Sequence, residues 1–115
     1  MKYINKRLTI EKVKVQDLAK KFGTPIYCYS FNKLKENINS FKKNFESFVP
    51  LICFAVKSNT NLKLIKEIRK FGLGADVVSK GELMMAIKAG VSPKKIVFSG
   101  VGKTSSEIAY AIDKK

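Results

Sequence analysis

Apolar residues recur at helical spacing in the first half of the chain and predict two helices there. Residues 15–22 carry four apolar side chains on one face of a short helix that Gly23 ends. A longer helix is predicted to begin after an N-cap at Ser30 and to end at Pro50. Its apolar stripe, with alternating steps of three and four, consists of Phe31, Leu34, Ile38, Phe41, Phe45 and Phe48. We expect this aromatic stripe to pack in a core.

Between these helices, the apolar stretch 26–29 follows a Thr24-Pro25 turn and predicts a strand. Residues 1–50 are therefore expected to form a helix–strand–helix segment.

A different pattern begins at residue 51, where short apolar runs alternate with amphipathic helices. The unbroken run 51–56 predicts a strand that is buried on both faces. Further strands are predicted at 75–78 and 96–98, and helices at about 61–71, from Ser79 to Gly90 and from Thr104 to Lys115. Ser79 with Glu82, and Thr104 with Glu107, fit the capping-box pattern at the start of a helix.

Strands and helices that alternate with short connections indicate right-handed βαβ units and a parallel sheet, so the fold class is α/β. Residues 51–115 are similar to the first three units of a (β/α)₈ TIM barrel, a fold of about 250 residues. We therefore expect a partial barrel over 51–115, preceded by the segment 1–50.

Charge is the most unusual feature of the composition. The net charge is +14, from 23 basic and 9 acidic residues, which is typical of nucleic-acid-binding proteins. Only Arg7 and Arg69 are arginine, however, and the lysines are scattered along the chain. We expect a solvated lysine-rich surface and no nucleic-acid partner.

The sequence also disfavours a zinc-binding protein and a membrane protein. The chain has no histidine, and Cys28 and Cys53 lie in separate apolar runs, so a zinc site is not expected. We expect both cysteines to act as small buried apolar residues in a reducing compartment. No apolar leader and no stretch of about 18 apolar residues occurs, so we expect no membrane span and a cytoplasmic location.

Candidate chemistry gathers at the carboxyl ends of the predicted strands, where α/β proteins build their sites. Lys57 follows the run 51–56 directly, and Asn59 comes two residues later. Such a lysine is either a surface residue or a desolvated amine that can form a Schiff base. Asp76 and Ser99 lie at the next two strand ends. A carboxylate beside an amine would tune its protonation, although Asp76 fits a structural hydrogen-bond acceptor equally well.

Four segments together resemble one enzyme family, the diaminopimelate decarboxylases. They are 24–30 (TPIYCYS), 54–59 (FAVKSN), 74–83 (GADVVSKGEL) and 96–104 (IVFSGVGKT). Ornithine and arginine decarboxylases are similar around the lysine, but the second pair of segments favours the diaminopimelate branch. The resemblance covers almost the whole chain from Val15 onward and implies the alanine-racemase-like fold of pyridoxal-phosphate enzymes.

The resemblance also implies an activity and a site. Lys57 would bind pyridoxal 5′-phosphate through a Schiff base, Asp76 would lie near that amine, and Asn59 and Ser99 would line the cofactor pocket. The implied reaction is decarboxylation of a small amino acid, meso-2,6-diaminopimelate, to L-lysine and CO₂ in lysine biosynthesis. The family forms homodimers, in which a C-terminal β-domain completes the neighbouring site.

Several parts of the family pattern have no counterpart in these 115 residues. They are the histidine that stacks on the cofactor, the glycine-rich phosphate loop, the acid that pairs with the pyridine nitrogen, and the C-terminal β-domain. We therefore expect an N-terminal fragment that is inactive alone and that a complementing C-terminal chain could complete. The alternatives are an ornithine- or arginine-type decarboxylase fragment, a non-catalytic remnant, or a small basic interaction domain.

Overall fold

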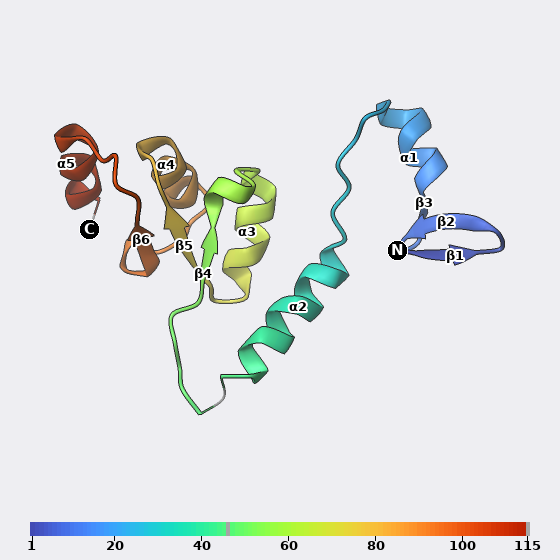
Figure 1. The fold of residues 1–115 in the computed structure, drawn as a ribbon, viewed down its shortest axis with the longest axis horizontal. Coiled ribbons are helices and arrows are strands. Elements are labelled where there is room, and N and C mark those ends of the chain that lie inside the picture. The colour runs from blue at the N-terminus through green and yellow to red at the C-terminus, as the bar shows by residue number, and fades with distance from the viewer. Residues whose placement is uncertain (46, 115) are drawn as a thin grey trace. The chain divides into compact units, whose positions relative to one another are not determined.

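The computed structural model describes residues 1–45 and 47–114, and the chain divides into two compact units, Met1–Phe48 and Val49–Lys115 (Figure 1). The first unit begins with a three-stranded antiparallel sheet in the order β1-β2-β3. Its strands are β1 (Lys2–Ile4), β2 (Arg7–Ile10) and β3 (Val13–Lys14). Asn5 and Lys6 both adopt positive φ, 48° and 59°, as the tight turn between two antiparallel strands requires. The sequence patterns above did not predict this sheet.

Helix α1 (Val15–Phe22) packs on β2 and β3 and confirms the first predicted helix. Gly23 ends it with a φ of +79°, and its amide donates to the Ala19 carbonyl oxygen at 2.8 Å.

The strand predicted at 26–29 is wrong. The structure has an extended segment there that joins no sheet, since the strands of this unit all come from residues 2–14. A strand requires a partner for its backbone hydrogen bonds, and without one the apolar side chains remain in solvent, as Tyr27 does with 90% of its surface exposed.

Helix α2 (Phe31–Lys43) begins at the predicted N-cap, where the Ser30 hydroxyl accepts from the Lys33 amide at 3.1 Å. It ends well before Pro50, because the Phe45 amide turns to the Lys42 carbonyl, three residues back, at 3.0 Å. No residue of α2 is buried, so the aromatic stripe forms no core within the described part of this unit. Glu46, within the predicted helix, lies outside the described residues.

The second unit is a three-stranded parallel sheet in the order β4-β5-β6, with a helix after each strand, and it confirms the predicted α/β pattern. Its elements are β4 (Cys53–Ala55), the 3₁₀ turn η1 (Val56–Ser58), α3 (Leu62–Lys70), β5 (Gly74–Val77), α4 (Lys80–Lys88), the 3₁₀ turn η2 (Pro93–Lys95), β6 (Ile96–Phe98) and α5 (Ser105–Asp113). The last predicted helix thus ends at Asp113, and Lys115 lies outside the described residues.

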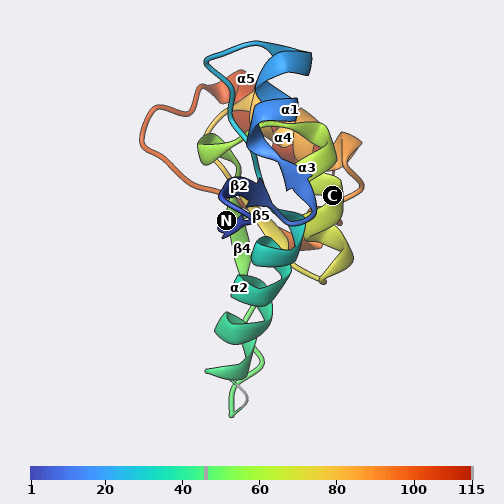
Figure 2. The same cartoon turned by 90° about the vertical axis from the view of Figure 1, so that its right-hand side faces the viewer.

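One face of this sheet carries the core. Ala75 and Val77 of β5 pack with Ile65 of α3 and with Leu83 and Ala86 of α4, and all five are at most 4% exposed. Tyr110 and Ala111 of α5 pack against the same cluster. The three helices therefore lie on one side of the strands, as Figure 2 shows for α3 and α4.

Gly74 lets the sheet approach the turn that precedes β6. A Cβ atom at this position would lie 2.1 Å from the Lys95 carbonyl oxygen, a backbone atom. Only a glycine fits this contact. Within 1–45 and 47–114, none of the helices is long and apolar enough to cross a membrane.

Candidate functional site

The predicted site residues follow or lie on neighbouring strands of the second unit. In the sheet register, Ala55 of β4 is level with Asp76 of β5, and Asp76 is level with Val97 of β6. Residues that are level in adjacent strands point to the same face, and Ser99 follows Val97 by two. Asp76 and Ser99 therefore share the face opposite the helices, near the carboxyl ends of their strands.

A direct hydrogen bond joins Asp76 and Ser99. The Ser99 hydroxyl donates to Asp76 Oδ1 at 2.6 Å, in a partly buried setting. The Ser99 amide also donates to the Val77 carbonyl oxygen at 2.9 Å, which continues the sheet pattern just past β6. The structure thus brings these two predicted residues together.

Lys57 lies beyond the end of β4, but its local setting differs from the prediction. The run 51–56 was expected to be one buried strand, but β4 covers only three residues, and all three are partly exposed. They are exposed because β4 is an edge strand that pairs only with β5 and because the helices cover only one face of the sheet. Val56, fully buried, begins the turn η1, and Lys57 is its exposed second residue. The Ser58 hydroxyl closes this turn by donating to the Ala55 carbonyl oxygen at 2.8 Å.

The Lys57 amine makes no hydrogen bond or ion pair with any residue in 1–45 or 47–114. Lys57 comes two residues after Ala55, which is level with Asp76, so its backbone leaves the sheet at the same edge as Asp76. A primary amine at that edge is free to react with an aldehyde.

Asn59 has a local role in the structure. Its side-chain oxygen accepts from the Asn61 amide at 2.9 Å, and the Asn61 side chain in turn accepts from the Lys63 amide at 3.0 Å at the start of α3. Within the described chain, no hydrogen bond links Asn59 to Lys57, Asp76 or Ser99.

The two predicted capping boxes differ in the structure. The Ser79 hydroxyl accepts from the Glu82 amide at 3.2 Å, but the Glu82 carboxylate accepts from the Val78 amide at 3.0 Å, so this box is not closed on Ser79. Thr104 and Glu107 form the complete box. Glu107 also accepts from the Lys80 amide at 3.1 Å, a link that no local pattern signals because the two residues are 27 positions apart.

Cys53 lies on the same face of the sheet as Asp76, nearer the amino ends of the strands, because it is level with Gly74. Burial raises the pKa of the Cys53 thiol, and the negative charge of Asp76 raises it further. The thiol therefore stays protonated near neutral pH, and its role is that of a small apolar residue.

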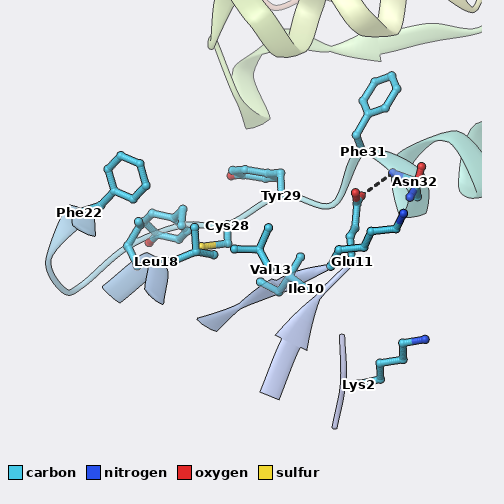
Figure 3. Close-up of a pocket in the computed structure, with 13 residues that line it drawn as sticks. Lys2, Ile10, Glu11, Val13, Leu18, Phe22, Cys28, Tyr29, Phe31 and Asn32 are labelled. Carbon is cyan, nitrogen blue, oxygen red and sulfur yellow. Dashed lines mark hydrogen bonds between the residues drawn. The ribbon is translucent and has the colours of Figure 1, made fainter. Parts of the chain in front are cut away.

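A hollow of about 770 Å³ lies in the first unit and contains none of the predicted site residues (Figure 3). Its wall is largely apolar, with Leu18, Phe22 and Ile10 among its residues. Glu11, at its rim, accepts from the Ser30 hydroxyl at 2.8 Å and from the Asn32 amide at 2.9 Å and thereby caps α2. Among the residues that the structure describes, no group of three His, Cys, Asp or Glu could hold a metal ion.

Comparison with known proteins decides the family. Residues 31–115 match the family described as pyridoxal-dependent decarboxylase, pyridoxal binding domain. The chain belongs to the pyridoxal-dependent decarboxylase family. Its sequence is 47% identical over 113 residues to the diaminopimelate decarboxylase of Aquifex aeolicus, and 43% identical over 109 residues to that of Vibrio cholerae. These alignments cover 98% and 95% of this chain but only 26% of each relative, so the chain spans about a quarter of their length.

Solved structures of this decarboxylase family agree with the fold. A protein from Aquifex aeolicus superposes with a TM-score of 0.92 at 47% identity, over 98% of this chain and 28% of its own. The diaminopimelate decarboxylase of Helicobacter pylori, solved with L-lysine, gives 0.79 at 42% identity, over 85% of this chain and 25% of its own. The α/β class and the parallel sheet are thus those of the family.

The described residues fit the cofactor that the family name implies. Pyridoxal phosphate carries an aldehyde, and Lys57 offers an amine with no competing partner in the described chain. Asp76 lies at the same edge of the sheet, and one of its carboxylate oxygens is held by Ser99.

Proposed function

We propose that this chain provides the cofactor-binding lysine of a diaminopimelate decarboxylase, with Lys57 as the residue that binds pyridoxal 5′-phosphate. The observation that carries the proposal is the arrangement at the carboxyl edge of the sheet. The Lys57 amine, which has no partner among residues 1–45 and 47–114, lies beyond the end of β4, and the hydrogen-bonded pair Asp76 and Ser99 lies at the ends of β5 and β6.

The second unit is, in this proposal, the first sector of a (β/α)₈ barrel. Its strands follow chain order and its helices all pack on one face, as a singly wound sheet requires, whereas a doubly wound sheet has helices on both faces. The face that carries Asp76 would then line the barrel interior. Residues 51–115 would form the cofactor-binding sector, and residues 1–50 a segment that precedes it.

The chemistry divides between cofactor and protein. When bound, pyridoxal phosphate supplies the electron sink for the carbanion that loss of CO₂ leaves. Lys57 would hold the cofactor and orient it. Asp76 would lie near the Lys57 nitrogen, and the Ser99 hydroxyl, which donates to one of its oxygens, would fix the direction of its side chain. Asn59 shapes the turn between Lys57 and α3.

The substrate proposed is meso-2,6-diaminopimelate, which loses one carboxyl group as CO₂ and gains a proton to give L-lysine. The relatives at 42–47% identity described above carry the diaminopimelate decarboxylase name, whereas an ornithine decarboxylase structure from Entamoeba histolytica is only 28% identical. This difference favours the diaminopimelate branch over an ornithine- or arginine-type enzyme.

The rest of the site is expected from further polypeptide, in the same chain or in a second, complementing one. As the family pattern implies, we propose a homodimeric assembly in the cytoplasm with a small amino-acid substrate.

The first test is chemical capture of the cofactor. The 115-residue chain is mixed with pyridoxal phosphate and reduced with borohydride, and the modified lysine is mapped by mass spectrometry. We expect selective labelling at Lys57 that K57R abolishes and that K63R, at an exposed lysine of α3, leaves unchanged. Labelling spread over many lysines, or insensitive to K57R, would contradict the proposal and favour a non-catalytic remnant.

The second test concerns the substrate. The chain is co-expressed with the remaining length of the Aquifex aeolicus relative, and CO₂ release is compared for meso-diaminopimelate, L-ornithine and L-arginine. Release from diaminopimelate that K57R removes supports the proposal. Preference for ornithine or arginine would reassign the substrate.

A further inference from the structure

Glu107 connects the N-termini of two neighbouring helices. Its Oε2 accepts from the Thr104 amide at 3.0 Å and from the Thr104 hydroxyl at 2.9 Å, which closes the capping box of α5. Its Oε1 accepts from the amide of Lys80, the first residue of α4, at 3.1 Å. One carboxylate therefore satisfies free amides of both helices.

The bond to Lys80 is not needed to cap α5, since the Thr104 contacts already do so. It instead ties the start of α5 to the start of α4, where Ser79 and Glu82 hold the segment that follows β5. The Lys80 ammonium also lies over the Tyr110 ring of α5, 4.8 Å from its centre. These contacts join the two helices at the edge of the sheet that carries the site.

The loop between β6 and α5 ends at Thr104, which Glu107 caps. At its first residue, Ser99 is held by the Val77 carbonyl and by the Asp76 carboxylate. In its middle, Val101 is fully exposed, and nothing lies within 4 Å of a Cβ built at Gly102. At its far end, Thr104 is held by Glu107. Between these ends, the Lys103 amine donates to the Gly100 carbonyl oxygen and lies 5.5 Å from the centre of the Phe98 ring. Glu107 supplies the contact at the far end, where the loop meets α5.

We propose that Glu107 is a positioning residue for the Asp76–Ser99 pair. By tying α5 to α4 it fixes where the loop after β6 must end, and so restrains the backbone of Ser99 and the hydroxyl that orients Asp76. In this proposal Glu107 acts through Ser99, since its own contacts are to Thr104 and Lys80. Its catalytic consequence rests on the proposed function, whereas its effect on Ser99 does not.

The charge state of Glu107 suits this role. The amide of Thr104, and after it that of Lys80, lower the pKa of the Glu107 carboxyl below its ordinary value of 4.5. The carboxylate is therefore ionised at neutral pH and can accept from both amides. In Glu107→Gln, one of the two oxygens becomes an NH₂ group, which cannot accept from an amide. The variant can keep one of the two helix contacts but not both.

The first measurement needs no cofactor. Amide hydrogen exchange is compared in the 115-residue chain, in E107Q and in the control E67Q, which removes a carboxylate paired with Lys70 within α3 at 2.7 Å. We expect exchange at the Ser99 amide to accelerate on the order of tenfold in E107Q, the size of one lost hydrogen bond, and to stay unchanged in E67Q. Faster exchange at Lys80 and Thr104 with unchanged exchange at Ser99 would show a purely local cap and overturn the inference.

The second measurement concerns the cofactor lysine. We expect E107Q to slow borohydride-trapped labelling of Lys57 several-fold, and to have no further effect when combined with S99A, because the two changes act through one hydrogen bond. Additive effects would overturn the inference. If the unmodified chain does not label at Lys57, the proposed function fails, and exchange at Ser99 alone decides the role of Glu107.

Discussion

The Ser99 hydroxyl lies 2.6 Å from Asp76 Oδ1 and joins the ends of two adjacent parallel strands. The two residues are 23 positions apart, and they meet because Asp76 is level with Val97 and Ser99 follows on the same face. The sheet register, not a local motif, creates this pair.

Replacing Ser99 with alanine is expected to lower the free energy of unfolding by about 1 kcal/mol, since Asp76 loses a hydrogen-bond donor in a partly buried setting. Urea denaturation measures the change. Ser105→Ala, at an exposed position in the first turn of α5, serves as the control and should have no measurable effect. Equal effects of the two substitutions would mean that the Asp76–Ser99 bond does not contribute to stability.

Replacing Lys57 is expected to leave stability unchanged within about 0.5 kcal/mol, because its exposed side chain makes no hydrogen bond or ion pair in the described chain. The thermal unfolding midpoints of K57M and the unmodified chain, followed by circular dichroism, should therefore coincide. A large drop in K57M would show that the lysine contributes to folding, and would weaken its assignment as a reactive amine.

A pair of glycine substitutions tests the close approach of β5 to the turn before β6. Gly74→Ala places a methyl group 2.1 Å from the Lys95 carbonyl oxygen and should cost about 3 kcal/mol or prevent folding. Gly102→Ala meets nothing within 4 Å and should be nearly neutral. The comparison fails if G74A is as stable as G102A in the same denaturation experiment.

Stability should also depend on acid pH through Glu107. Its pKa is lowered in the folded chain, chiefly by the Thr104 amide, so the folded state binds its proton less readily than the unfolded state does. The resulting stabilisation is complete above the ordinary value of 4.5 and is lost as the pH falls through the folded pKa. We expect the thermal midpoint to fall between about pH 5 and pH 3, and to fall less steeply in E107Q. Parallel pH curves for both proteins would refute this.

Sequence patterns predicted the parts of the fold that local chemistry determines. The helix over 15–22 ends at Gly23 as expected, and the predicted residues Ser30, Ser79 and Thr104 cap the helices that follow them. Hydrophobic period and capping residues act within a few positions, so one sequence suffices to read them.

Errors arose where pairing or packing decides the outcome. The stretch 26–29 has the composition of a strand but no partner, and the short strands over 2–14 have partners but little apolar patterning. A two-residue turn at Asn5 and Lys6, where positive φ suits asparagine, is the signal that could have revealed that sheet.

The candidate site was predictable only in part. Lys57, Asp76 and Ser99 could be selected because they lie at the carboxyl ends of predicted strands. The structure then joins Asp76 to Ser99 by a hydrogen bond. The 3₁₀ turn under Lys57, the local role of Asn59 and the link from Glu107 to Lys80 all depend on three-dimensional contacts.

The strand order of the second unit has a consequence for biosynthesis. Because β4, β5 and β6 are neighbours in the same order as they occur along the chain, each strand pairs with the one made just before it. Such pairing of successive strands allows the sheet to assemble in order as the chain leaves the ribosome. The strand ends that carry Lys57 and Asp76 can then pair before β6 and α5 have emerged, and Ser99 joins them once α5 and its Glu107 have followed.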